Sequence, residues 1–289
     1  MGADWSARLA YALTRGLLAL PRMPSPADIA AYIGAAAWLP QIGSWIYDRY
    51  VPPVVRIIPE RQVQLGYTTL GPIFNVRLAL VADRKDAIVE HMEARVRHEQ
   101  GDVHTFTWTG LREMFSEITD SAGNRGVVER DQPAIALKVS TALPVEKFVR
   151  FQDVAYHDRH RVPMESLVAQ FNYAKANYPD FRERILQSKE YHSLLEFYRA
   201  EFWWKPGKYT ATLSIQSSSR ARLRSDTFGF QIAQYDVDAM RGNLDVMNAE
   251  YRNTIMMGAD GYEPSPIAWA WRTLPLNPMR TGIPARAAV

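Results

Sequence analysis

Residues 62–108 constrain the fold more than any other part of the chain, because polar and apolar side chains alternate along them. A period of two is the pattern of β-strands that bury one face. Val63, Leu65 and Tyr67 share one such face, and residues 73–81 repeat the pattern. The sequence therefore predicts neighbouring antiparallel strands that the rest of the chain covers or extends.

A tight turn at Gly101 is expected to join two of these strands. A three-residue loop needs a residue with a positive φ angle, which glycine supplies at low cost. This register sets Ala94 opposite Phe106 and Met92 opposite Trp108, so that the four apolar residues share a face. A four-residue loop would turn that face outward, so we predict the shorter loop.

Ile88 precedes this strand and is expected to share the buried face with Met92 and Ala94. The alternation places His91 and Glu93 on the opposite face, toward solvent.

Composition narrows the classes of function. The chain has 289 residues, of which 47% are hydrophobic and 22% charged, as in an ordinary folded protein. Its net charge of +3 is too small to indicate a nucleic-acid partner by itself. It contains no cysteine, which excludes a disulfide framework, a thiolate zinc site and a cysteine nucleophile.

The rest of the chain completes a mixed fold. Alternation returns in four later stretches, residues 135–139, 147–151, 209–215 and 228–232. Residues 162–203 instead carry apolar residues at helical spacing. We predict an α+β fold in which an antiparallel, Ig-like β-sandwich spans residues 54–235 and contains an inserted helical pair near 162–203. A helix and a Pro- and Trp-rich tail, residues 236–289, would pack on the sandwich.

Residues 1–50 are expected to form an N-terminal apolar helical segment. Residues 5–20 have an amphipathic pattern, which suits either a membrane or partner surface or the protein's own domain. Residues 29–47 lack charge and have a length that can span a bilayer. Pro40 leaves two alternatives, a helical hairpin broken at that residue and an interfacial segment. The residues expected at the membrane are Ile29, Tyr32, Ile33, Trp38, Leu39, Trp45, Ile46 and Tyr47.

Arginines alternate in a short stretch near residue 222. Arg220, Arg222 and Arg224 would share one face of a strand, and aligned guanidinium groups bind phosphate or another anion. Lys205 and Lys208 could extend this patch. An edge strand protected from aggregation by charge would have the same sequence.

Two tryptophan pairs are candidate interface residues. Trp203 and Trp204 precede a Pro-Gly turn, and Trp269 and Trp271 alternate in the tail. Exposed aromatic residues often carry binding energy, whereas buried ones simply fill a core.

His157 and His160 belong to the densest group of candidate metal ligands. They would share a face if they lie on a helix, and Asp153 could join them if the helix extends back. A metal site needs three or four ligands, so we predict no metal and no cofactor. No catalytic residue can be assigned, since the chain lacks a Gly-x-Ser-x-Gly motif and the glycine-rich phosphate loops.

These observations favour a non-catalytic protein-interaction protein with an unknown protein partner. We expect it to lie on the cytoplasmic side of a bacterial-type membrane, in contact through residues 5–47, or in the cytoplasm. One alternative is an anion or nucleic-acid binder that uses the arginine strand, and another is a metal-dependent hydrolase centred on the two histidines.

Overall fold

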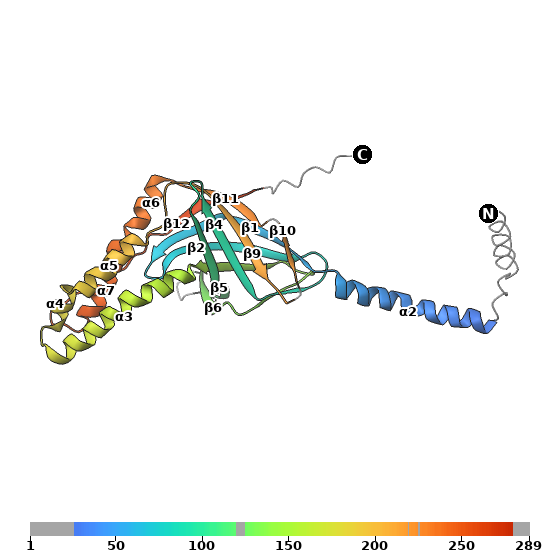
Figure 1. Ribbon diagram of the computed structural model, residues 1–289, viewed down its shortest axis with the longest axis horizontal. Coiled ribbons are helices and arrows are strands. Elements are labelled where there is room, and N and C mark those ends of the chain that lie inside the picture. Colours follow the sequence, from blue (N-terminus) through green and yellow to red (C-terminus); the bar gives the residue numbers. More distant parts are fainter. Residues whose placement is uncertain (1–25, 120–124, 219, 225, 280–289) are drawn as a thin grey trace, which may run out of the picture. The chain divides into compact units, whose positions relative to one another are not determined.

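The computed structural model describes residues 26–119, 125–218, 220–224 and 226–279. The chain divides into two compact units, Met1–Pro52 and Pro53–Val289. In the first unit the described element is helix α2 (Pro26–Tyr50). The amphipathic helix predicted within residues 5–20 lies outside the described residues. The second unit contains the sheet and the remaining helices (Figure 1).

Helix α2 is continuous through Pro40, so the hairpin predicted to break at that residue is wrong. Proline removes one helical hydrogen bond, from the carbonyl of Ala36 four residues earlier. Ala36 is exposed, so water can satisfy this carbonyl. None of the helices in the described part of the chain, α2 included, is both long and apolar enough to cross a membrane. Helix α2 therefore does not bear out the prediction that residues 29–47 span a membrane.

The second unit is a mixed α+β structure built on one large, curled, largely antiparallel sheet. Within the described residues this sheet has eleven strands. Its central strands, in spatial order, are β1 (Val54–Thr68), β2 (Gly71–Ala82), β8 (Val145–Gln152), β5 (Val103–Thr119), β4 (His91–His98), β9 (Gly207–Gln216) and β11 (Thr227–Ile232). Strand β6 (Arg125–Pro133) pairs with β5, and β10 (Arg222–Arg224) pairs with β1 in parallel. A separate pair consists of β3 (Ala87–Val89) and β7 (Leu137–Val139).

A short C-terminal segment joins the two edges of the curled sheet. Strand β12 (Arg272–Pro275) pairs with β1, and β13 (Asn277–Pro278) pairs with β11. Leu274 and Leu276 from this segment are buried, at 5% and 2% exposure. We call residues 272–278 the closing segment, because they bridge the first strand and the last strand of the sheet.

The core lies inside the curl and follows the predicted alternation. Val63, Leu65 and Tyr67 are at most 1% exposed, which confirms the face predicted for β1. Phe74 of β2 lies 6.0 Å from the ring of Phe230 of β11, although these strands are not neighbours in the sheet. Aromatic side chains from opposite parts of the curl therefore meet in one core.

The predicted turn at Gly101 is confirmed. Gly101 has a φ angle of 101°, and the amide of His98 donates to the carbonyl of Asp102 at 2.8 Å. Ala94 pairs with Phe106 as expected. Ile88 is different, because it belongs to β3 and is 48% exposed. Glu90 separates β3 from β4 and shifts the alternation by one residue. Ala87 and Val89 face inward before it, whereas Met92 and Ala94 face inward after it.

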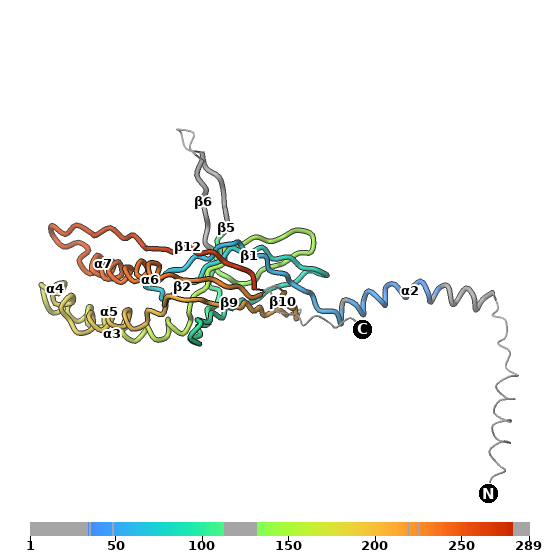
Figure 2. The backbone as a smooth tube through the Cα atoms, turned by 90° about the horizontal axis from the view of Figure 1, so that it is seen from above, coloured from blue at the N-terminus to red at the C-terminus, as the bar shows by residue number. Residues whose placement is uncertain are grey.

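Three helices are inserted between β8 and β9, where the sequence predicted a pair. They are α3 (Val154–Asn177), α4 (Phe181–Leu186) and α5 (Lys189–Ala200). Two helices, α6 (Gln234–Arg241) and α7 (Asn243–Met256), follow β11 where one was predicted. Helix α3 packs against α4 and α5, and α7 packs against the same two helices. Figures 1 and 2 show these helices gathered at one end of the sheet.

Candidate functional site

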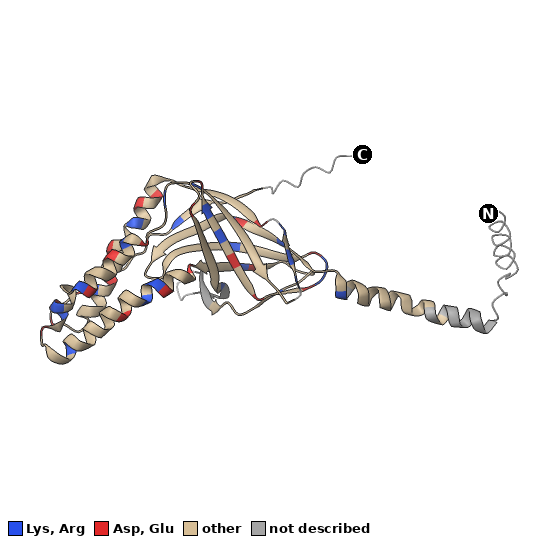
Figure 3. Ribbon diagram, in the orientation of Figure 1, with Lys and Arg blue, Asp and Glu red and all other residues tan. Residues whose placement is uncertain are grey.

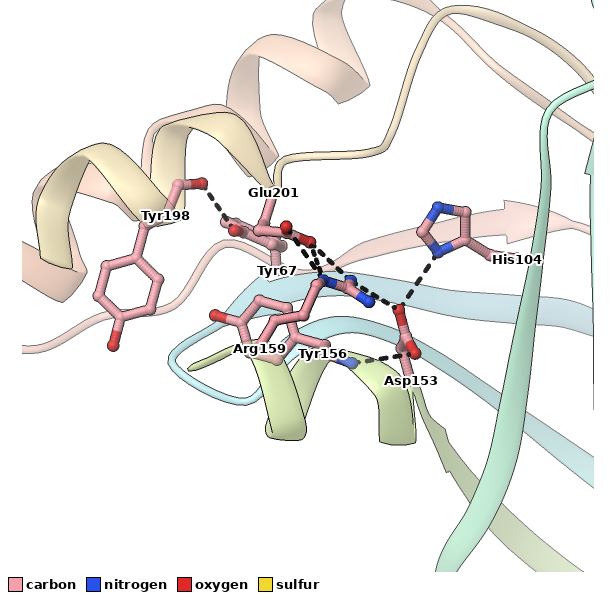
Figure 4. Close-up of polar contacts among 7 residues, drawn as sticks. All are labelled: Tyr67, His104, Asp153, Tyr156, Arg159, Tyr198 and Glu201. Carbon is pink, nitrogen blue, oxygen red and sulfur yellow. Dashed lines mark hydrogen bonds and ion pairs between the residues drawn. The ribbon is translucent and has the colours of Figure 1, made fainter. Parts of the chain in front are cut away.

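Four polar side chains, three of them charged, meet where the inserted helices join the sheet (Figure 4). His104 comes from β5, Asp153 directly precedes α3, Arg159 lies on α3, and Glu201 directly follows α5. Together we call them the junction cluster. The cluster links a strand to the beginning of one helix and the end of another, so it fixes how the helices sit on the sheet.

Asp153 is the centre of this cluster. One carboxylate oxygen lies 3.3 Å from Nδ1 of His104 and 3.5 Å from the guanidinium of Arg159. The other oxygen accepts the backbone amide of Tyr156 at 3.2 Å and so caps α3. Burial by itself raises the pKa of Asp153, but the hydrogen bonds from His104 and Tyr156 and the charge of Arg159 outweigh it. The pKa therefore lies below its ordinary value.

Arg159 extends the cluster to the end of α5. Its Nε and Nη2 atoms donate to the Glu201 carboxylate at 3.1 and 2.6 Å. This is the two-pronged geometry in which arginine binds a carboxylate most strongly. Hydrogen bonding to Glu201 raises the pKa of Arg159 above its already high ordinary value, so the guanidinium stays charged.

Buried tyrosines surround the charged groups. The Tyr67 hydroxyl donates to the backbone carbonyl of Tyr198 at 2.7 Å, and the Tyr198 hydroxyl lies 2.7 Å from that of Tyr251. Burial raises the pKa of Tyr67, of Tyr198 and of Tyr156, whose ring packs over Gly71. These phenols therefore stay neutral, and those of Tyr67 and Tyr198 serve as hydrogen-bonding groups within the core.

The His104–Asp153 pair is the arrangement that orients a general base in hydrolases. A hydrolase of that kind also needs a hydroxyl or thiol beside the imidazole. The described contacts of His104 are instead with Asp153 and with the rings of Trp203 and Phe106, at 4.2 and 6.3 Å. This geometry supports a structural junction.

The arginines predicted to bind an anion are only partly aligned. Arg222 and Arg224 lie on β10 and are exposed, whereas Arg220 precedes the strand with a φ angle of 55°. Arg224 pairs with Arg56 of β1. Sequence reasoning missed Arg56, because only the parallel pairing of β10 with β1 brings it beside the others.

Lys205 and Lys208 do not extend this patch, so that part of the prediction is wrong. Both lie near the beginning of β9, whereas Arg222 follows the end of that strand. A strand of this length separates its ends by about 30 Å. Lys205 instead binds the carboxylate of Asp102 at 2.5 Å.

Trp203 and Trp204 are core residues, so the interface predicted for this pair is wrong. They are 9% and 1% exposed, and the Trp204 indole donates to the carbonyl of Gly66 at 3.0 Å. Trp271 is 37% exposed, but its ring covers Gly66, and Trp269 packs against the core. All four tryptophans thus contribute to packing.

The two candidate metal ligands are engaged in hydrogen bonds. Nε2 of His160 lies 2.7 Å from the Tyr198 hydroxyl, and Nε2 of His157 lies 3.4 Å from Gln152. Burial, followed by the charge of His157, lowers the pKa of His160. Across the described ranges, no three His, Asp or Glu side chains are grouped so that they could hold a metal ion.

Helix α2 displays the residues predicted to contact a membrane. The side chains of Ile29, Tyr32 and Ile33 lie outside the described part of the structure. The other predicted residues are exposed, namely Trp38, Leu39, Trp45, Ile46 and Tyr47, at 65%, 65%, 64%, 47% and 43%. Ile42 and Tyr50 of the same helix are also exposed, at 49% and 73%.

Comparison with known proteins gives no relative: no protein family, no curated protein and no solved structure matches this chain.

Proposed function

We propose that this chain is a non-catalytic interaction protein that α2 tethers to the surface of a membrane. The observation that carries the proposal is the set of large apolar side chains that α2 exposes to solvent. With 3.6 residues per turn, Trp38, Ile42 and Trp45 fall on one face, with Leu39 and Ile46 beside them. The opposite face carries Tyr47 among the small residues Ala36, Ala37, Gly43 and Ser44 and the proline Pro40.

A lipid surface suits this bulky face better than water does. Tryptophan, leucine and isoleucine of interfacial helices insert into the boundary between headgroups and acyl chains. Each such side chain gains up to about 1.5–3 kcal/mol when it is fully buried. Leaving so many large apolar side chains in water would be unusual for a soluble surface. The absence of cysteine means that the fold needs no disulfide, which is compatible with the cytoplasmic side of the membrane.

Removal of the bulky face should release the protein from vesicles. We expect the full-length Trp38→Ser/Ile42→Ser/Trp45→Ser variant to bind phosphatidylcholine vesicles at least about a hundredfold more weakly than the wild type. Co-sedimentation with vesicles measures this. The control Ala36→Ser/Ala37→Ser/Gly43→Ser changes the opposite face of α2 and should bind nearly as well as the wild type. Equal binding by the wild type and both variants would exclude α2 as the tether.

The second unit supplies the scaffold in this proposal, and we propose that its curled sheet is an Ig-like sandwich. The contact of Phe74 with Phe230 supports two facing layers. The alternating burial along β4 supports a sheet that has one buried face and one solvent-exposed face. The chemistry of the junction cluster supports a non-catalytic role, because the contacts of His104 with the described residues include no nucleophile.

We place the protein partner on the outer face of β4 and β9. Arg95 and Arg97 are exposed there, and no ion pair of either arises within the described residues. Arg95 lies between Thr105 of β5 and Thr212 of β9. A face of hydroxyl and guanidinium groups suits a polar protein surface, since arginine is enriched at interfaces.

Substitution of these two arginines should weaken partner binding. We expect the Arg95→Ser/Arg97→Ser variant to lose at least one protein that the wild type captures from cell extract, because an interface arginine often contributes 2 kcal/mol or more. Quantitative affinity capture measures the loss. Arg161→Ser/Arg199→Ser on the helices removes equal charge and should leave that protein bound. If no captured protein distinguishes the two variants, the partner does not bind on this face.

A further inference from the structure

The end of the sheet where β1 begins has a surface unlike the rest of the second unit. We call it the Val54 end. Strand β2 finishes there at Ala82, whose amide donates to the carbonyl of Ser140 at 3.1 Å. This bond holds the β7–β8 connection beside β2, and β3 and β7 pair next to it. The helices follow the opposite ends of these strands, since α3 follows Gln152, which pairs with Ile73 near the beginning of β2.

Large apolar side chains project into water at the Val54 end. Ile135 and Leu143 are 81% and 71% exposed, and Ile88 is 48% exposed. They belong to β3 and to the segments that flank β7. Ile58, on the outer face of β1 two residues beyond Arg56, is 47% exposed. Exposed apolar side chains grouped in this way mark a protein or membrane contact.

Two of the three arginines at this end, Arg56 and Arg224, lie near the same described carboxylate. Figure 3 shows how basic and acidic residues are distributed over the sheet. Arg56 and Arg224 are cross-strand neighbours, and Arg222 shares their face of the sheet. Asp83 lies 3.9 Å from Arg56 and 4.0 Å from Arg224, beyond the length of a good hydrogen bond. Like charges side by side in a sheet are unfavourable. A single nearby carboxylate does not neutralise three arginines, so the group keeps a net positive charge. Its guanidinium groups can therefore donate hydrogen bonds to an anion.

We infer that the Val54 end docks on a membrane that contains anionic lipids. Ile135 and Leu143 insert at the headgroup boundary, while Arg56, Arg222 and Arg224 bind lipid phosphates. Guanidinium groups match phosphate oxygens in a two-pronged manner. A free phosphate would satisfy the arginines but not the apolar side chains, so the combination selects a lipid surface.

The inference rests on the proposed tether in one respect. Helix α2 ends at Tyr50, and β1 begins at Val54. Four residues of chain reach at most about 15 Å. A membrane-bound α2 therefore keeps the first residue of β1 close to the bilayer. An apolar helix together with a basic patch supplies the two signals that stable membrane attachment requires.

Vesicle binding by the full chain tests the arginines. We expect the wild type to bind vesicles with phosphatidylserine about a hundredfold more tightly than pure phosphatidylcholine vesicles, since each arginine contributes about fivefold. Arg56→Gln/Arg222→Gln/Arg224→Gln should abolish this preference and leave phosphatidylcholine binding unchanged. The control Arg161→Gln/Arg199→Gln/Lys208→Gln removes equal charge elsewhere and should retain most of this preference. Equal losses in the two variants would overturn the inference.

The apolar side chains are tested in the same assay. Ile135→Ser/Leu143→Ser should weaken binding to both kinds of vesicle about tenfold. Val162→Ser/Met257→Ser alters two residues of similar exposure on the helices, at 67% and 74%, and should have no effect. No loss in the first variant would overturn the insertion of these side chains. Displacement of the wild type by inorganic phosphate would overturn the lipid assignment in favour of a free phosphate.

The vesicle assays distinguish failure of the proposed α2 tether from failure of the proposed docking by the Val54 end. If α2 is not the tether, the Trp38→Ser/Ile42→Ser/Trp45→Ser variant binds like the wild type, while the loss on substitution of the three arginines persists on anionic vesicles. If the Val54 end does not dock, the α2 variant still loses binding and the arginine variant keeps its preference for phosphatidylserine.

Discussion

Gly71→Ala is expected to lower the free energy of unfolding by about 3–4 kcal/mol. Gly71 has a φ angle of 84°, where an L side chain costs about 1–2 kcal/mol. A methyl group there would also lie 2.6 Å from the ring of Tyr156, which is fully buried and cannot move aside easily. Urea unfolding followed by tryptophan fluorescence measures the change, and the melting temperature should fall by about 10 °C.

Gly101→Ala is the matched control for this substitution. Gly101 also has a positive φ angle, 101°, but a methyl group there meets nothing within 4 Å. We expect a loss of only about 1–2 kcal/mol, the cost of the backbone conformation alone. Equal losses at the two glycines would show that the packing of Tyr156 on the β1–β2 turn is not tight.

Asp153→Ala should destabilise the protein by about 2–3 kcal/mol, because it removes the cap of α3, the hydrogen bond to His104 and the ion pair with the exposed Arg159. The carboxylate is buried, caps α3, and faces both His104 and Arg159. Equilibrium urea unfolding gives the difference. Glu201→Gln is the comparison, since Glu201 is partly exposed and its loss should cost about 1 kcal/mol. Similar values for the two variants would contradict the central place of Asp153.

The contribution of Asp153 to the free energy of unfolding should also disappear at low pH. Its folded pKa lies below the unfolded value of about 3.9. Stabilisation is therefore complete above about pH 4 and is lost as the pH falls through the folded pKa. Asp153→Asn keeps a side-chain oxygen for the cap but does not titrate. The gap in stability between wild type and Asp153→Asn should shrink below pH 4, and a gap that widened there would contradict the ion pairing.

Local patterns in the sequence predicted much of the sheet. Alternation identified the buried face of β1, and the conformational requirement at Gly101 fixed the register of β4 with β5. These features depend on neighbouring residues, so one stretch of sequence contains them. The same reasoning failed at Ile88, because Glu90 changes the phase between two strands and nothing local announces it. It failed at Pro40 because exposed flanking residues tolerate an internal proline.

The candidate sites depend on residues far apart in the chain. His104, Asp153 and Glu201 come together only when β5, α3 and α5 are assembled. Asp153 has a local signal, an aspartate just before a helix, but its partners have none. Arg56 likewise joins Arg222 and Arg224 through a pairing between the first strand and a much later one. Such juxtapositions follow from topology, which periodicity does not encode.

The closing segment has a consequence for biosynthesis. β1 emerges from the ribosome early, but its partner Leu274 is made only after all the inserted helices. Until then β1 lacks β12 and β11 lacks β13, so each presents unpaired backbone groups of the kind that recruit foreign strands. Strand pairing over such sequence separation is also slow. The nascent chain is therefore exposed to aggregation until the closing segment has been made, and a premature stop before residue 272 would leave both edges unpaired.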